Sequence, residues 1–152
     1  MSLTSDSSSR LFFVTGNDNA HQNTELAASG RVPIGTLGQA IVNLNIDPET
    51  SKLSLADYFQ PYDYIPLDGG DRDLGSSGIA LLESSVFKGN SIQQIGCTAG
   101  KNGKAYIVDM NNLGGFKNGP GGGDSVLQTL PMPGGGPIFG GIGSCPLDGG
   151  YI

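Results

Sequence analysis

Short apolar runs separated by polar, glycine-rich turns dominate the pattern of this chain. Residues 11–15 (LFFVT) are aromatic and β-branched, and residues 16–19 (GNDN) supply turn chemistry directly after them. Residues 39–47 and 52–59 alternate apolar and polar side chains around a turn at 48–51, which predicts a β-hairpin. The pattern predicts an all-β fold.

The second half of the chain continues this alternation with longer turns. Three further strands are predicted, at residues 79–83, 92–98 and 104–109. Residues 64–78 crowd aspartates and glycines before an apolar run, which predicts a loop that delivers a buried strand rather than a helix. Residues 20–38 predict a long surface loop, because Gly30 and Pro33 end the only weak helical pattern within about two turns.

Three segments carry a resemblance to a known family. They are residues 57–63 (DYFQPYD), the Asp-rich turn that ends in Asp-Leu-Gly-Ser-Ser-Gly, and residues 100–109 (GKNGKAYIVD). In this order they resemble the blade-to-blade signatures of quinoprotein-like β-propellers, which carry PQQ-type repeats. The resemblance implies antiparallel blades joined by long glycine-rich loops. At about 40 to 50 residues per blade, the chain holds about three blades, whereas closed propellers have about four to eight.

This resemblance predicts a β-propeller fragment rather than a closed ring. We expect a polar, disordered N-terminus at residues 1–10 and a partial propeller domain at 11–152. Within it, blade units are expected at about 11–62 and 63–117, with an incomplete unit from about 125. Residues 38–42 (GQAIV) also match residues 103–107 (GKAYI), as repeated units do. Missing blades or self-association would complete the ring.

Composition narrows the partners of the chain. Its 152 residues include 26 glycines, 9 prolines and no tryptophan, and its formal net charge is −6. Only 8 residues are Lys or Arg, which argues against a nucleic-acid partner, and the acidic balance disfavours anionic membranes. No apolar run has the length of a transmembrane helix, so no membrane insertion is predicted. A protein or a carbohydrate ligand is the expected partner.

Asp68, Asp71 and Asp73 form a candidate Ca²⁺ site, with Asp63 nearby. Carboxylate oxygens in a flexible loop are the ligands that Ca²⁺ prefers. The spacing differs from an EF-hand loop, which places oxygen ligands at positions 1, 3 and 5. Aspartates beside glycines also form ordinary turns, and we favour this structural alternative.

Tyr58, Tyr62 and Tyr64, with Phe59 and Pro61, are the only aromatic cluster. Their rings are candidates for binding, by stacking on the sugar rings of a ligand. A hydrophobic corner between blades is the alternative use, and we favour it.

Cys97 and Cys145 are the only cysteines, and with a single His21 they match no zinc pattern. Cys97 lies in an apolar run, which predicts a buried thiol. A disulfide between the two cysteines is left open, and it would imply an oxidising compartment. A secreted or cell-surface protein is favoured over a cytoplasmic one if the true N-terminus is missing. His21 lies in a polar stretch and is expected to be solvated rather than to act as a general base.

The family resemblance implies a function only in outline. Quinoprotein dehydrogenases bind PQQ on the ring axis, commonly with a tryptophan below the quinone, a Ca²⁺ ion and a catalytic aspartate. This chain lacks tryptophan and adjacent cysteines, so no catalytic residue is assigned. We expect a non-catalytic scaffold or binding module with no cofactor. The alternative is a fragment of a PQQ-dependent oxidoreductase, in which PQQ and Ca²⁺ would be bound.

Overall fold

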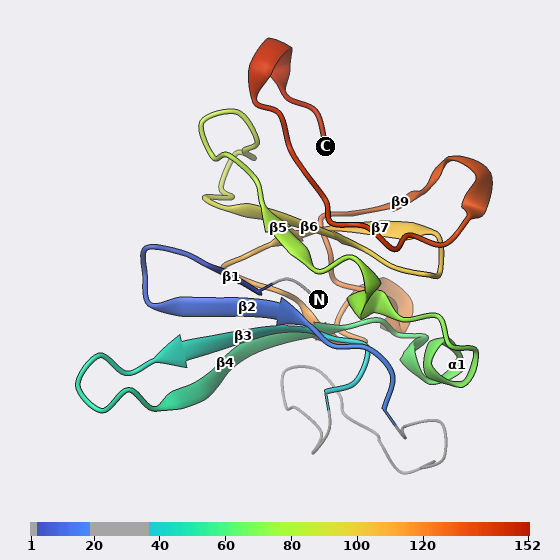
Figure 1. Ribbon diagram of the computed structural model, residues 1–152, viewed down its shortest axis with the longest axis horizontal. Helices are drawn as coiled ribbons and strands as arrows, with labels where there is room; N and C mark the ends of the chain where they lie inside the picture. Colours follow the sequence, from blue (N-terminus) through green and yellow to red (C-terminus); the bar gives the residue numbers. More distant parts are fainter. Residues whose placement is uncertain (1–2, 19–36) are drawn as a thin grey trace.

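The computed structural model describes residues 3–18 and 37–152 (Figure 1). These residues form two sheets of mainly antiparallel strands with little helix, so the all-β prediction is confirmed. Of the surface loop expected at 20–38, residues 20–36 lie outside the described residues.

The first sheet has the strand order β1-β2-β3-β4-β8. Its strands are β1 (Leu3–Ser5), β2 (Arg10–Val14), β3 (Ile41–Ile46), β4 (Leu53–Gln60) and β8 (Gly115–Phe116). Consecutive strands from β1 to β4 pair antiparallel, and the short β8 joins β4 in parallel. The predicted hairpin around the turn at 48–51 is confirmed as β3 and β4.

The second sheet has the order β5-β6-β7-β9, and all its pairs are antiparallel. Its strands are β5 (Ile79–Leu81), β6 (Ile95–Ala99), β7 (Lys104–Asp109) and β9 (Gln128–Pro131). All three strands predicted in this part of the chain are present. β9 pairs with β7, so the start of the expected third unit supplies the fourth strand of the second sheet.

The segment between the two sheets is partly helical, which corrects the loop expected at 64–78. It contains α1 (Tyr64–Gly69) and a 3₁₀ turn, η2 (Leu74–Ser76). A helix forms because Tyr64 and Leu67, three positions apart, are both buried. Pro66 is tolerated, since the first turn of a helix leaves its backbone N–H groups without intrahelical acceptors. Three more 3₁₀ turns follow later in the chain: η3 (Pro120–Gly122), η4 (Pro133–Gly135) and η5 (Leu147–Gly149).

The N-terminus is ordered from residue 3, in contrast to the disordered start that we expected. The Asp6 carboxylate accepts the backbone N–H groups of Ser8 at 2.9 Å and Arg10 at 3.3 Å, which closes the turn between β1 and β2. Arg10 also forms a 2.5 Å ion pair with Asp6. Burial raises the pKa of Asp6, but the hydrogen bonds from Arg10 and Ser8 outweigh it and hold the pKa below its ordinary value.

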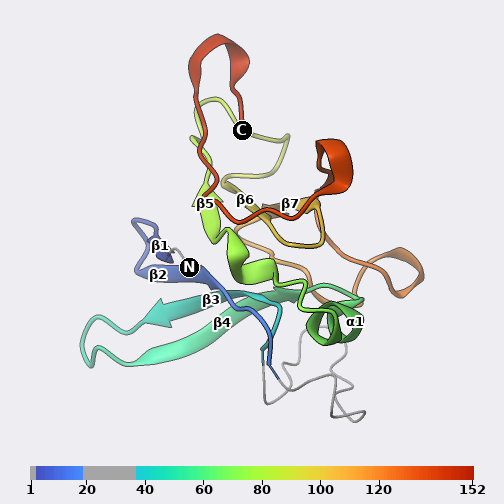
Figure 2. The ribbon, with the colours of Figure 1, turned by 45° about the vertical axis from the view of Figure 1, so that its right-hand side comes forward.

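The two sheets face each other across one shared core, with the second sheet above the first in Figures 1 and 2. Its members are Phe12, Val14, Ile41, Phe59, Leu74, Ile79, Tyr106, Val108, Met110 and Leu113. Phe12 and Val14 of β2, and Tyr106 and Val108 of β7, are two residues apart, which matches the two-residue period of a strand. The rings of Phe59 and Tyr106 meet across it, with centroids 5.5 Å apart. β1 and β5, the first strands of the two sheets, lie beside each other.

Candidate functional site

The inner face of the first sheet changes from apolar to polar along its strands. Val14, Ile41 and Phe59 are register partners on neighbouring strands, and all three are fully buried. Two residues along the same face, Asn43 lies opposite Asp57. Asn43 also pairs with Phe12 of β2, so the core gives way to polar side chains on β3 and β4 while β2 stays apolar at this position.

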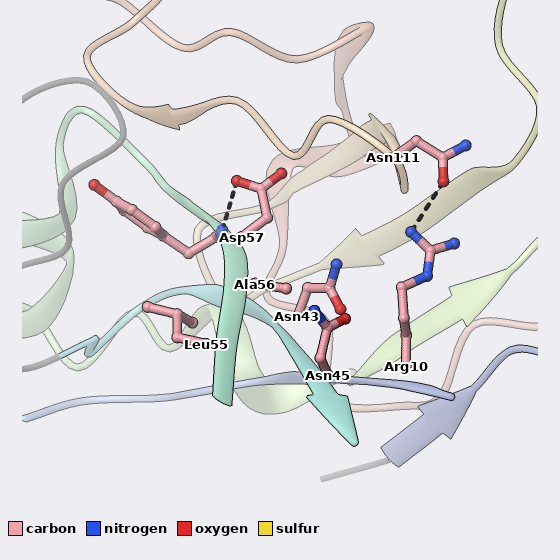
Figure 3. Close-up of a pocket in the computed structure, with 8 residues that line it drawn as sticks. Arg10, Asn43, Asn45, Leu55, Ala56, Asp57 and Asn111 are labelled. Atoms are coloured by element: carbon pink, nitrogen blue, oxygen red, sulfur yellow. Dashed lines mark hydrogen bonds between the residues drawn. The ribbon is translucent and has the colours of Figure 1, made fainter. Parts of the chain in front are cut away.

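A pocket of about 620 Å³ opens at this polar end (Figure 3). It is lined by Arg10, Asn43, Asn45, Leu55, Ala56, Asp57, Tyr58 and Asn111. Asn111 follows β7 of the second sheet, and the other seven residues belong to β2, β3 and β4 of the first. We call this cavity the inter-sheet pocket, because both sheets contribute to its wall.

A β-bulge shapes the wall of the inter-sheet pocket. Asn43 pairs with Asp57, but the next residue, Leu44, pairs with Leu55, so that Ala56 has no partner in the ladder. Bulges bend a strand and re-aim its side chains, and they are frequent beside binding sites. The bulge lies where β3 and β4 line the pocket.

Arg10 links the two sheets at the pocket through hydrogen bonds. Its guanidinium donates to the Asp6 carboxylate at 2.7 Å, to the Met110 carbonyl at 3.2 Å and to the Asn111 side chain at 2.9 Å. Figure 3 shows Arg10 reaching across to Asn111. The cation also lies 5.2 Å from the centre of the Phe12 ring. Its donors are thus directed largely at the protein itself.

Asp57 and Asn43 differ in how their oxygens are satisfied. Asp57 accepts the backbone N–H groups of Tyr58 at 2.9 Å and Leu113 at 2.8 Å. Asn43 is only 4% exposed, and its Oδ1 has no hydrogen-bond partner among the described residues. A buried acceptor without a donor is costly, so the pocket wall carries an unmet hydrogen bond.

The three aspartates of the predicted Ca²⁺ site gather around the segment that follows β2. Asn17 donates its backbone N–H to Asp73 at 2.8 Å and its side-chain amide to Asp71 at 2.8 Å. The backbone N–H of Asp18 donates to Asp68 at 2.6 Å. All three carboxylates thus accept hydrogen bonds from residues 17 and 18, which join this loop to the segment after β2.

Lys101 places its own cation beside two of these carboxylates. Its ammonium lies 2.6 Å from Asp73 and 3.2 Å from Asp71, and these hydrogen bonds raise the pKa of Lys101. Over residues 3–18 and 37–152, no group of three or more His, Cys, Asp or Glu side chains is arranged to hold a metal ion. A Ca²⁺ role for Asp68, Asp71 and Asp73 stays a prediction.

Asp63 lies apart from this cluster, in a second acidic site that the sequence did not indicate. Its carboxylate is 3.5 Å from Lys104, while Asp124 accepts the backbone N–H of Tyr62 at 2.8 Å. Burial and, to a lesser extent, the charge of Asp63 raise the pKa of Asp124. Asp124 follows a glycine-rich segment, and no local pattern pointed to its partial burial.

The structure separates Tyr62 from the other two candidate tyrosines. Tyr58 and Tyr64 are buried in a small cluster, where Tyr64 meets Phe116 edge to face at 5.3 Å. Burial, with the charges of Asp18 and Asp68, raises the pKa of Tyr64. Tyr62 is 48% exposed. A binding role for the three tyrosines stays a prediction, and Tyr62 alone presents much of its surface to a ligand.

The second sheet carries an apolar surface on the face turned away from the first sheet. Small and β-branched residues line it: Ala80, Cys97, Ala99, Ala105 and Ile107. Met132, Ile138 and Ile142, from the segment after β9, pack on this face, and together with Leu130 they line a groove of about 570 Å³. We call it the outer groove.

Both cysteines are free thiols, so the disulfide that the sequence left open is absent. Cys97 is buried under the outer groove, whereas Cys145 is exposed. Burial raises the pKa of Cys97 to about 11, which keeps this thiol protonated at neutral pH. His21 lies outside the described residues.

No protein-family model, curated protein or solved structure matches this chain. Among the described residues, no helix is both long and apolar enough to span a bilayer.

Proposed function

We propose that the chain is a non-catalytic scaffold or binding module of the β-propeller type. Two antiparallel units, β1 to β4 and β5-β6-β7-β9, each place their strands side by side in chain order, although β8, between β7 and β9 in sequence, joins the first sheet. Blades of a propeller have this up-and-down order and bring their first strands together near the ring axis. The proximity of β1 and β5 supports such an arrangement.

The apolar outer groove is the observation that carries the proposal. A sheet in a propeller is covered on both faces, by the blade before it and the blade after it. The inner face of the second sheet packs on the first sheet, and its far face is also apolar. Leu130, at the edge of this face, is 39% exposed. We therefore expect a further sheet to cover the outer groove.

The reactive groups of the described residues serve the structure, which supports a scaffold rather than an enzyme. The Lys101 ammonium is held by two carboxylates, and burial keeps the Cys97 thiol protonated. The Arg10 guanidinium joins the two sheets. None of these groups is poised as a nucleophile or a general base.

Sedimentation of the purified chain over a range of concentrations tests this proposal. The wild-type protein should self-associate through the outer groove, and Leu130→Lys should weaken the association by at least about tenfold, because a charge replaces apolar contact area. Leu53→Lys is the matched control, since Leu53 is an exposed leucine of the first sheet, far from the groove. It should associate as the wild type does.

A monomer at all concentrations, with no effect of Leu130→Lys, would overturn the scaffold proposal. The same preparation should show no dye-linked oxidation of alcohols or aldoses after addition of PQQ and Ca²⁺. Robust turnover in that assay would contradict the non-catalytic part of the proposal.

A further inference from the structure

We infer that the inter-sheet pocket binds a neutral, hydroxyl-rich ligand, namely a saccharide of one or two sugar units. This inference rests on the proposed function, because it names a ligand for the binding module. The pocket, at about 620 Å³, falls within the size range of small-molecule sites, about 300 to 1,000 Å³.

The unmet acceptor of Asn43 shows what the ligand must supply. Asn43 lies on the inner face of β3, nine-tenths or more buried, and its Oδ1 receives no donor from the described residues. Its side chain belongs to the pocket wall, between Asn45 and Asp57 (Figure 3). A ligand O–H or N–H that donates to this oxygen would satisfy it.

The other polar groups of the pocket suit a ligand that both donates and accepts. The side-chain amides of Asn45 and Asn111 each offer donors and an acceptor, and both residues are exposed. The Asp57 carboxylate can only accept. A sugar hydroxyl has one donor and two lone pairs, so several hydroxyls on one ring can match this mixed set.

The charges of the pocket argue against an anionic ligand. Among the described residues that line it, Arg10 is the one cation, and it forms a 2.5 Å ion pair with the Asp6 carboxylate. Asp57 adds a negative charge to the wall, and the chain as a whole carries a net charge of −6. A phosphate or carboxylate would meet repulsion there, whereas a neutral ligand would not.

The apolar part of the wall is small and accessible. Leu55 is 40% exposed, and the bulge places it beside Ala56 at the rim. Such a surface can cover the C–H face of a sugar ring while the asparagines bind its edge. The wall therefore combines many polar groups with little apolar area, as a hydroxylated ligand needs.

Side-chain amide resonances of the full chain in NMR test the inference, with maltose, cellobiose and N-acetylglucosamine as probes. At least one sugar should shift the amide signals of Asn45 and Asn111 with a Kd at or below about 10 mM. Asn43→Leu should raise this Kd at least about tenfold, because it removes the buried acceptor while it keeps the branched shape of the side chain. Asn90→Leu, at an exposed asparagine outside the pocket, should leave the Kd unchanged.

Asn45→Leu keeps the test decisive if Asn43→Leu fails to fold. Asn45 is exposed, so its replacement should not unfold the chain, and it should weaken sugar binding several-fold. Leu130→Lys separates this inference from the scaffold proposal, because it should weaken association and leave sugar binding intact.

Three results would overturn the inference. The first is the absence of any sugar-dependent shift of the pocket amides, which would mean that water alone fills the pocket. The second is sugar binding that neither Asn43→Leu nor Asn45→Leu weakens. The third is a larger shift of the same signals with inorganic phosphate than with any sugar, which would identify an anion site.

Discussion

The two sheets contain similar antiparallel strands, but they differ in where their polar and apolar side chains lie. The first sheet places a polar row, Asn43 and Asp57, on its inner face, and a pocket opens there. The second sheet keeps its inner face apolar with Tyr106 and Val108 and is apolar on its outer face as well. This difference is the basis for our two proposals, which place a ligand site at the first sheet and a packing surface on the second.

Replacement of a large core residue should lower the free energy of unfolding more than any other substitution considered for the two sheets. Phe59→Ala removes a fully buried ring from the first sheet, together with its contact to Tyr106, and should lower the free energy of unfolding by about 3–5 kcal/mol. Leu130→Ala, on the outer face of the second sheet, should cost less than about 1 kcal/mol in the monomer. Urea unfolding at low protein concentration measures both values. Equal losses would mean that the outer groove is already a closed core.

Replacement of Asp57 should lower the free energy of unfolding more than replacement of an aspartate at the exposed end of the first sheet that also accepts two backbone N–H groups. Asp57→Ala leaves the buried N–H of Leu113 without an acceptor and should cost about 2 kcal/mol. Asp47, in the exposed turn between β3 and β4, also accepts two backbone N–H groups, from Glu49 and Thr50. Because water can replace that acceptor, Asp47→Ala should cost less than Asp57→Ala in thermal or urea unfolding. The reverse order would contradict our description of the pocket wall.

Cys97 should make the outer face of the second sheet sensitive to alkaline pH. Its folded pKa of about 11 lies above the ordinary value of 9.0, so the folded state retains the thiol proton more strongly. The resulting stability is fully present below pH 9 and is lost as the pH rises toward 11. At pH 10 the wild type should have lost about 1 kcal/mol more than Cys97→Ala, relative to pH 8.

Urea unfolding of the two proteins at both pH values measures this difference. Alkylation gives an independent check, because exposed Cys145 should react at pH 8 while Cys97 reacts only after unfolding. Rapid alkylation of Cys97 in the folded protein would contradict its burial.

Much of the fold follows from local patterns that the sequence displays. The strands at 11–15, 39–59 and 104–109 were predictable, because alternation or β-branched runs ended in recognisable turns. The helix α1 was not, since its six residues carry aspartate, glycine and proline, which signal turns. The burial of Tyr64, which packs against Phe116, and of Leu67 contributes to its stability.

The sequence did not predict the register of the strands, and therefore not which side chains face the core. The match of residues 38–42 with 103–107 aligns Ile41 with Tyr106, yet both side chains point into the same core from opposing sheets. Equivalent residues of successive propeller blades face the same way around the ring. A shift of one residue reverses the face of every side chain, so this short match does not define a structural repeat.

The inter-sheet pocket could not be predicted either, because its residues are far apart in the chain. Arg10, Asn43, Asp57 and Asn111 meet only through strand pairing and sheet packing. In contrast, Asp68, Asp71 and Asp73 were predicted as a candidate site because they are neighbours in sequence. Their contacts come from Asn17, Asp18 and Lys101, elsewhere in the chain.

The smallest effect is expected from Ca²⁺. Because Lys101 already places a cation beside Asp71 and Asp73, calorimetry should show no Ca²⁺ binding tighter than about 1 mM, or about −4 kcal/mol. The stability of the protein is measured in parallel, and the protein without added Ca²⁺ is the reference. Micromolar affinity that Asp71→Ala abolishes would overturn this expectation and give the acidic turn a metal role.

Methyl NMR with a soluble paramagnetic agent tests most directly the central claim that the outer face of the second sheet is an interface. We expect the methyls of Ile107 and Leu130 to be broadened in dilute solution and to become protected as the protein associates. The methyls of Ile79 and Val108, on the inner face, should be protected at every concentration. Outer-face methyls that are protected in the dilute monomer, or that stay exposed when the protein associates, would contradict the account.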